Sequence, residues 1–554
     1  MRAILRATSA YGSLLRESFH PDLLRDGLDR DRLFDRLWVA VPQSAHLARV
    51  ICAEGEDLLN GDVPFFTSRT DSVDVWTSAH ERVADFFAEP AIERVRRRLR
   101  RMGESDQVRQ IWFIRASMAV LSPAGHESPR TPAPTGHSER AVDSASLLSA
   151  ARAIGDRIEA LSLRGDQDAC WIGLTPLNEH DWTLTPLGLD LYDGLPGVAM
   201  FLAYLGKLTG EHRYTTLAQA AVAGLQAQVE QARSSVQQIG GFTGWGGVVY
   251  ALTHLSALWG QVDLLAEAEG IVALLPPRIE RDEQFDLISG SAGCIAGLLA
   301  LHHYAPSSVT LEAARQCGNH LIAHATRLPQ GVGWIGKDVS NTPLSGFSHG
   351  ASGIAWALLE LSAATGDARF RSVACSALDY ERSLFSPQEG NWPDLRETHA
   401  GKFGMTWCHG APGIGLAYLC SLAHIDNAEI RRHIDAALQT TLTQGFGGNH
   451  SLCHGDLGNL ETLLQASLRL KDPCWQVEVD RRAGSILRSI EQNGWKCGNP
   501  VGVEAPGLMT GLAGIGYELL RLSAPTRIPS VLALALPYIE TSETKASDHV
   551  LAAV

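Results

Sequence analysis

Seven copies of the motif Gly-x-x-Gly, each followed by an apolar run, constrain the fold of this chain more than any other feature. The first glycines follow one another at intervals of 45 to 60 residues, a period typical of repeat architectures. The runs are apolar on nearly all sides, which predicts buried inner helices. Amphipathic segments between them, such as 214–229 and 428–442, fit an outer layer. We therefore predict an all-α fold, an α/α toroid of seven inner and seven outer helices.

The residues just before these glycines should meet at one mouth of the ring, because equivalent positions of a closed repeat lie at the same height. We call this mouth the rim. A mouth that gathers polar side chains and two thiols resembles a ligand pocket. Directly before the seven glycines stand Asp193, Thr243, Ser289, His349, His409, His454 and Thr510, and one position earlier stand Tyr192, Phe242, Ile288, Ser348, Cys408, Cys453 and Met509.

Length and composition divide the chain and exclude some classes of function. A chain of 554 residues exceeds one ordinary core, and a stretch rich in Pro, Ser and Thr at 122–143 predicts a linker between units 1–121 and 144–545. A net charge of −14 argues against nucleic acid as a partner. No apolar run approaches the roughly 18 residues of a membrane span and no signal peptide opens the sequence, so we expect a cytoplasmic protein.

Two segments with the sequence Cys-His-Gly predict a metal site. Ten cysteines are too sparse for a disulfide framework, whereas thiolate and imidazole donors suit zinc. With Cys408, Cys453 and His454 as ligands, a fourth position remains open for water or substrate, as in catalytic zinc sites. The alternative is that both cysteines are small buried hydrophobes. Their identical placement in two repeats favours the metal.

The toroid segment resembles the lanthionine synthetase cyclases (LanC), in the form found in class II lanthipeptide synthetases (LanM). All seven repeats carry the resemblance, including WCHGAPGIGLAYL at 407–419, SLCHGDLGNLETLL at 451–464, GFSHGASGIAWALLEL at 346–361 and DLISGSAGCIAGLL at 286–299. It implies zinc-dependent addition of peptide cysteine thiols to dehydroalanine or dehydrobutyrine, which forms thioether rings. It also implies a dehydrated precursor peptide as a partner, and a separate dehydratase could be a second one.

By this resemblance, Cys408, Cys453 and His454 match the zinc ligands, His349 matches the acid/base histidine and Asp286 matches the active-site aspartate. A histidine can exchange a proton near neutral pH, whereas the alternative for both residues is a polar cap on an inner helix. The role of His409 stays open. The sequence departs from the family at Gly404, where some stand-alone cyclases carry a basic residue; Lys402 lies nearby.

Residues 14–38 and 54–72 resemble the last part of the LanM dehydratase domain, which has a kinase-like fold. The first 121 residues lack the lysine, phosphate cradle and metal-binding acids that phosphoryl transfer needs, so we expect a mostly helical remnant without dehydratase activity. Arg69 is a weak candidate for the elimination site of a complete domain. Residues 1–121 could instead be a helical docking module, or the start of the gene could lie further upstream.

Three other functions are compatible with the sequence. A LanC-like enzyme could add glutathione to dehydroamino acids through the same zinc chemistry. An inactive toroid could serve as a peptide-binding scaffold for a separate dehydratase, although intact ligands argue against it. A toroidal glycosidase would use paired carboxylates, for which the rim offers Asp193, Asp286 and Asp456.

Overall fold

The computed structural model describes residues 1–121, 142–177, 181–337, 340–396, 399, 401–499 and 501–538. Contacts divide the chain into two compact units, Met1–Gln110 and Ile111–Val554. The predicted linker 122–143 lies outside the described residues except for its last two positions, as does the predicted limit at 545. The domain limits drawn from the sequence therefore stay predictions. None of the helices in the described ranges combines the length and apolar character that a membrane crossing requires.

The first unit packs short helices beside a small antiparallel sheet with strand order β1-β2-β3-β4. Two apolar clusters hold it together, one around Tyr11, Phe34 and Leu58 and one around Phe66 and Val75. The sheet was not predicted, because its strands are only two residues long and carry no readable alternation. The elements are β1 (Arg2–Ala3), α1 (Thr8–Ser18), α2 (Gly27–Phe34), η1 (Asp35–Ala40), η2 (Ala45–Arg49), α3 (Ile51–Leu59), β2 (Phe66–Thr67), β3 (Val75–Trp76), β4 (Arg82–Val83) and α4 (Ala91–Arg101). Helix α5 (Glu104–Val120) runs across the division.

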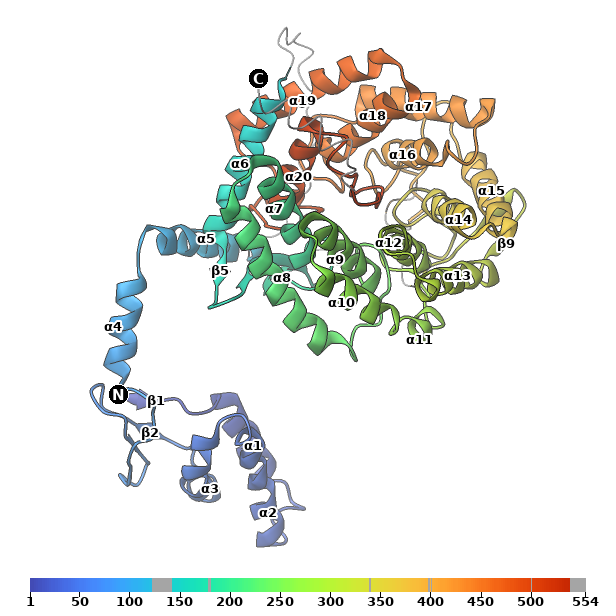
Figure 1. Ribbon diagram of the computed structural model, residues 1–554. Helices are drawn as coiled ribbons and strands as arrows, with labels where there is room; N and C mark the ends of the chain where they lie inside the picture. The colour runs from blue at the N-terminus through green and yellow to red at the C-terminus, as the bar shows by residue number, and fades with distance from the viewer. Residues whose placement is uncertain are drawn as a thin grey trace. The chain divides into compact units, whose positions relative to one another are not determined.

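The second unit is a closed ring of helices, which confirms the predicted toroid (Figure 1). Seven inner helices within the described residues each contact the next, and α20 contacts α7, so the ring closes. Each inner helix begins directly after one of the seven first glycines. They are α7 (Leu195–Thr209), α9 (Trp245–Trp259), α12 (Ser291–Tyr304), α14 (Ala351–Thr365), α16 (Ala411–Ser421), α18 (Asp456–Leu470) and α20 (Leu512–Ser523).

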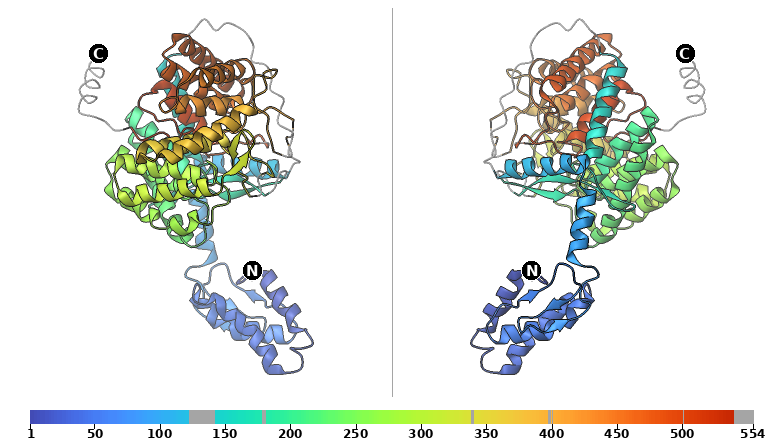
Figure 2. Two further views of the ribbon diagram at one scale, coloured as in Figure 1. Left: turned by 90° about the vertical axis from the view of Figure 1, so that its right-hand side faces the viewer. Right: turned by 90° about the vertical axis from the view of Figure 1, so that its left-hand side faces the viewer.

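Seven outer helices in the described part of the chain surround this ring, and each packs mainly against one inner helix. Six of them follow their inner partner along the chain, whereas α6 precedes every inner helix and packs against the last one, α20. Seen from the edge in Figure 2, the ring's outer helices lie stacked beside one another. They are α6 (Ser144–Leu161), α8 (His212–Ala232), α10 (Val262–Val272), α13 (Ser308–Ala323), α15 (Ala368–Ser383), α17 (Ala428–Gln444) and α19 (Pro473–Asn493).

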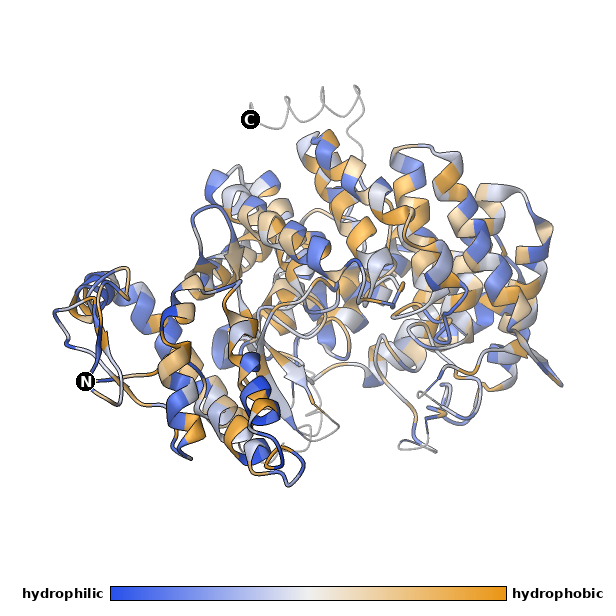
Figure 3. Ribbon diagram, turned by 90° about the horizontal axis from the view of Figure 1, so that it is seen from below, coloured by the Kyte–Doolittle hydropathy of each residue, from blue (hydrophilic) through white to orange (hydrophobic). Residues whose placement is uncertain are grey.

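Burial explains the two layers. Nearly every residue of an inner helix is buried, whereas outer helices bury one face and expose the other, and both kinds of face are visible along them in Figure 3. One continuous apolar core fills the space between the layers. The connections add the short helix α11 (Pro276–Ile279) and three hairpins, β5 (Leu163–Arg164) with β6 (Ala169–Cys170), β7 (Ile172–Pro176) with β8 (Trp182–Pro186), and β9 (Thr326–Leu328) with β10 (Gly331–Gly333).

The second glycine of each motif is required by close packing. A Cβ at Gly353 would lie 1.8 Å from the carbonyl oxygen of Phe347, far inside van der Waals contact, so a side chain there would displace the loop before the helix. The first glycine has a further role at Gly410, whose φ of +95° is accessible mainly to glycine. The repeated glycines therefore hold the rim loops tightly against the helix starts.

A collar of hydrogen bonds joins neighbouring rim loops around the mouth of the ring. At five junctions the bond runs between backbone groups, and at a sixth the Ser348 hydroxyl donates to the Cys408 carbonyl at 2.9 Å. At the remaining junction, between the loops of Cys408 and Cys453, a hydrogen bond between the two free thiols takes the place of the backbone bond. The five backbone bonds run from Tyr192 to Phe242, Phe242 to Ile288, Leu287 to Ser348, Cys453 to Met509 and Met509 to Tyr192.

Candidate thiol and histidine site at the rim

Cys408 and Cys453 meet where the collar has no backbone bond among the described residues. The Tyr192 hydroxyl donates to Cys453 Sγ at 2.9 Å, and the Thr406 hydroxyl lies 3.2 Å from Cys408 Sγ. Tyr192, like the two cysteines, stands two positions before the first glycine of its repeat. The repeat pattern that predicted the meeting of the two thiols could therefore also have predicted Tyr192 beside them. The ring thus brings together two sulfurs whose residues lie 45 positions apart in sequence.

The hydrogen bond between the two thiols shifts their pKa values in opposite directions. The hydrogen bond from Cys453, together with His409, His454 and Thr406, lowers the pKa of Cys408 well below its ordinary value despite burial. The same hydrogen bond raises the pKa of Cys453, with burial and the Cys408 charge adding to it. A thiolate on Cys408 that accepts the Cys453 proton is the arrangement that these shifts favour. Thiolate is also the form in which cysteine binds metals.

His454 is oriented by a backbone carbonyl. Its Nε2 lies 2.7 Å from the Gly498 carbonyl oxygen, and a ring nitrogen at that distance from a carbonyl carries the proton. The lone pair of the neutral ring is then on Nδ1. A Cβ at position 498 would lie 2.8 Å from Nε2 and 2.5 Å from the Ser451 hydroxyl, so glycine leaves room for the ring.

These donors fit zinc on their chemistry. Two adjoining thiols and an imidazole with a free lone pair are the donor types that zinc prefers, and a second ring nitrogen held by a carbonyl is the usual support of a metal-binding histidine. Among the described side chains, no three His, Cys, Asp or Glu residues already surround a common point. Binding by Cys408, Cys453 and His454 therefore requires a side-chain adjustment, and their role stays a prediction.

His349 and Asp286 form the second pair at the rim. His349 Nδ1 lies 2.6 Å from Asp286 Oδ2, while the backbone amides of Ser289 and Gly290 donate to Asp286 Oδ1. The carboxylate is thus fixed by its own loop and is almost fully buried. With Nδ1 held by Asp286, His349 has Nε2 left for proton exchange. About a quarter of its side chain is exposed, 26 %.

Opposite electrostatic environments act on His349 and His409. Burial lowers the pKa of His349, but the Asp286 charge, the hydrogen bond to Asp286 and the Cys408 charge together raise it above its ordinary value. Burial, Arg396 and His349 lower the pKa of His409 to about 4. The two rings are stacked with centroids 5.7 Å apart. At neutral pH His349 is the ring able to carry a proton and His409 is neutral.

Arg396 is a rim residue that sequence reasoning missed. Asp394 holds its guanidinium at 2.6 Å, and Asp394 Oδ1 also accepts the Arg396 backbone amide. The guanidinium lies near enough to lower the pKa of both His349 and His409, and the charges of Cys408 and Cys453 act on it in turn. Lys402, the cation noted from the sequence, is exposed. A lone arginine in a loop gives no periodic signal, so only the fold reveals it.

Glu381 is a second missed residue, and it comes from outer helix α15. Its two carboxylate oxygens accept the backbone amides of Gly346 and Ser352 at 3.0 and 3.1 Å, so they clamp the loop that carries His349. The side chain is fully buried, and burial raises its pKa to about 8 despite these bonds. Sequence patterns place outer-helix acids at the surface by default, which explains why this one was overlooked.

The other candidates from the sequence have structural partners. Asp193 accepts the Thr510 amide and hydroxyl, and Asp456 accepts the amides of Gly447 and Gly448. With Asp286 bound to His349, the three rim carboxylates act as anchors, which disfavours a paired-carboxylate glycosidase. Arg69 is exposed in the first unit and pairs with Asp71 at 3.3 Å.

Two family models match this chain, one in each unit. The family model described as lanthionine synthetase C-like protein matches residues 185–533, which is more than half of the chain. A family model described as a domain of unknown function, DUF4135, matches residues 1–69. The first match covers the inner ring and all of the rim residues described above.

Among individual proteins, the lacticin 481/lactococcin biosynthesis protein LcnDR2 of Lactococcus lactis subsp. lactis is 24% identical over 267 residues. The match covers 46% of this chain and 27% of that protein, so the chain spans about a quarter of the relative's length. The solved structure of nisin cyclase is 17% identical, covers 70% of this chain and 96% of its own, and superposes with a TM-score of 0.52. That likeness establishes the shared ring fold.

Proposed function

Because the chain belongs to the lanthionine synthetase C-like family, we propose that its rim adds a peptide cysteine thiol to a dehydroalanine or dehydrobutyrine. The product is a lanthionine or methyllanthionine thioether ring in a precursor peptide of a lanthipeptide. One observation carries the proposal: the Cys408–Cys453 pair and the His349–Asp286 pair lie at the same mouth of one ring, with His409 touching both neighbourhoods. A thiol site beside a proton donor is what this addition requires.

Cys408, Cys453 and His454 are the residues that would hold a zinc ion. When bound, zinc lowers the pKa of a coordinated thiol, so that a substrate cysteine is a thiolate at neutral pH. The chain's own contribution is orientation. Tyr192 fixes one sulfur, Thr406 lies against the other, and the Gly498 carbonyl turns the ring of His454.

His349 is the proposed proton donor. Addition of a thiolate to the β-carbon moves an electron pair to the α-carbon, where an enolate forms and takes up one proton. His349 Nε2 can deliver that proton, while Asp286 stabilises the imidazolium and keeps the ring in position. The proton that the substrate thiol loses restores His349, so the cycle is balanced without a redox cofactor or a nucleotide.

The proposal concerns cyclisation, and dehydration of the peptide lies outside it. Residues 1–121 contain no set of phosphate-binding lysine and metal-binding acids. We place the reaction in the cytoplasm, where reduced thiols persist. All ten cysteines are free in the structure, which fits a reducing compartment.

The test combines metal content with a cyclisation assay on a peptide that has been dehydrated in advance. We expect about one zinc per chain and loss of free peptide thiol without a change of peptide mass. His349→Asn should keep the zinc and lose roughly 100-fold or more in rate. Unchanged turnover in that variant would refute its role, and addition of supplied glutathione in preference to ring closure would indicate the glutathione-adding enzyme instead.

A further inference from the structure

A cavity of about 530 Å³ opens at the end of the ring opposite the rim. Its walls come from the last turns of the inner helices α12, α18 and α20 and from the segment 525–538 that follows α20. Since the inner helices begin at the rim and rise 1.5 Å per residue, this cavity lies about 20 Å from the thiols. It is thus separate from the proposed cyclisation site.

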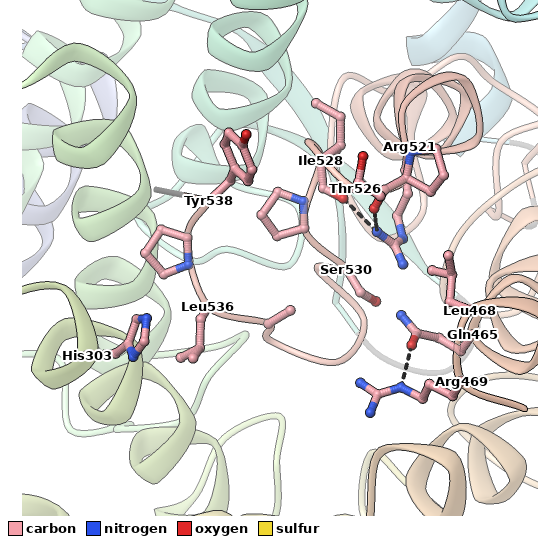
Figure 4. Close-up of a pocket in the computed structure, with 14 residues that line it drawn as sticks. His303, Gln465, Leu468, Arg469, Arg521, Thr526, Ile528, Ser530, Leu536 and Tyr538 are labelled. Carbon is pink, nitrogen blue, oxygen red and sulfur yellow. Dashed lines mark hydrogen bonds between the residues drawn. The ribbon is translucent and has the colours of Figure 1, made fainter. Parts of the chain in front are cut away.

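Half of the residues that line this cavity have polar side chains, and each of these side chains carries a hydrogen-bond donor. The cavity contains two arginines, Arg469 and Arg521, together with His303 and the hydroxyls of Ser530 and Tyr538, and no Asp or Glu of the described residues lines it. The absence of carboxylates contrasts with the whole chain, which carries 61 acidic against 47 basic residues. Figure 4 shows Arg521, Ser530, Gln465 and Arg469 along one side of the cavity and His303 across from them.

A buried chain of hydrogen bonds fixes Arg469. Arg521 Nε donates to Glu461 at 2.6 Å, Gln465 donates to the same carboxylate at 2.9 Å, and Arg469 Nε donates to Gln465 at 2.7 Å. Arg521 and Gln465 are 3 % and 5 % exposed, so this support is rigid. Within the described part of the chain, the two terminal nitrogens of Arg469 carry no hydrogen bond, and the guanidinium borders the cavity (Figure 4).

The two arginines differ in their partners. Arg521 pairs with Glu461 at 2.6 Å, whereas Arg469 Nε donates to the amide oxygen of Gln465. Among the described residues, Arg469 forms no ion pair, and burial raises the pKa of the nearby Glu518 well above its ordinary value, with the Glu461 charge adding to it. The carbonyl ends of three helices work against an anion here, so Arg469 must outweigh them. Arg521 is occupied by Glu461 and by the carbonyls of Pro525 and Ile528, which lie in the segment after α20. Ser530, which is 1 % exposed, accepts from the Ala533 amide and can still donate its own proton.

We propose that this cavity is an oxyanion-binding site in which the supported fork of Arg469 and the Ser530 hydroxyl hold a carboxylate or a phosphate group. A planar guanidinium held at Nε presents its two outer nitrogens in the geometry that such groups accept. The ligand is either an acidic side chain of a peptide or a free inorganic anion. The proposal goes beyond cyclisation and does not depend on it.

The experiment measures binding of a fluorescent peptide with four spaced glutamates by anisotropy, with a matched glutamine peptide as reference. The full-length protein should bind the glutamate peptide at low salt and not the glutamine peptide. Arg469→Gln should weaken binding at least tenfold, and Arg469→Lys should fall between, because it keeps charge and loses the fork. Arg481→Gln removes one charge from the exposed face of α19 and should change binding less than twofold.

Inorganic phosphate distinguishes the two sources of the anion. Displacement of the peptide by millimolar phosphate, with the same loss in Arg469→Gln, would identify a small-anion site that peptides share. Failure of phosphate to compete, with glutamate-dependent binding retained, would identify an acidic peptide. Equal binding by the wild type and Arg469→Gln, or by both peptides, would overturn the proposal. Zinc content and thiol consumption are measured in parallel, so that failure of the cyclase proposal is seen separately.

Discussion

The two Cys-His-Gly segments have the same sequence but different structures. In the first, Gly410 has a φ of +95°, and His409 stacks on His349 in the interior of the rim. In the second, Gly455 has a φ of −114°, and His454 bonds to the Gly498 carbonyl. The tripeptide alone does not assign a role to its histidine. The loop conformation around each copy decides which ring can serve as a ligand.

Their electrostatic surroundings also differ. The hydrogen bond between the two thiols lowers the pKa of Cys408 and raises that of Cys453. The neighbours add to this difference, since His409 and His454 lower the pKa of Cys408 whereas burial and the Asp193 charge raise that of Cys453. The ring therefore gives Cys408 the lower pKa, although the sequence treats the two cysteines as equivalent.

The largest expected effect comes from removing either sulfur. Cys408→Ala and Cys453→Ala should each abolish zinc binding and cyclisation, because two remaining donors hold zinc poorly. Elemental analysis and the thiol-loss assay measure both. Retention of zinc in one variant and its loss in the other would show that the segments are not partners in one site.

Substitution of the two histidines should affect zinc affinity to different degrees, unlike substitution of the two cysteines. His454→Ala should lower zinc affinity by about 100-fold or more, since it removes a ligand, whereas His409→Ala should leave the zinc in place. Competition with a chromogenic chelator measures the affinity of each variant. Equal losses of zinc affinity in the two variants would contradict the assignment of His454, rather than His409, as the ligand.

A smaller effect is expected at the support of His454. The Cβ of Gly498→Ala would press on Nε2 and on Ser451, so the ring must turn, and zinc affinity should fall about tenfold. Gly270→Ala is the matched control, because nothing lies within 4 Å of its added carbon. The same chelator titration, with thermal unfolding of both variants, shows whether the loss is local.

The smallest effect concerns the carboxyl beside the second segment. Burial raises the pKa of Asp193 to about 7 from an ordinary value of 3.8. The native state therefore holds this proton more tightly than the unfolded chain, and the contribution of Asp193 to stability is complete below pH 4 and lost as the pH rises to 7. Asp193→Asn should make the free energy of unfolding less dependent on pH in this range. Denaturant unfolding between pH 4 and 8 measures it, and an unchanged slope would contradict the assignment.

Much of this molecule could be predicted from sequence because its repeats are regular. The period of the glycine motifs and the apolar runs predicted the inner ring. The equivalent positions of Cys408 and Cys453 in their repeats predicted that the two thiols are neighbours. The sequence could not reveal Arg396 or Glu381, since each reaches the rim from an irregular loop or an outer helix whose position depends on tertiary packing. Nor could it show that His409 and His454 diverge, which depends on the conformation of two loops.

The pairing of α6 with α20 has a consequence for the order in which the protein is made. These partners are separated by about 350 residues, so α6 leaves the ribosome long before the helix that covers its apolar side. Every other outer helix follows its partner within a few residues and can pack as it emerges. Helices α7 and α8 touch α6 only in part, so most of this apolar side stays uncovered in the nascent chain until α20 has emerged.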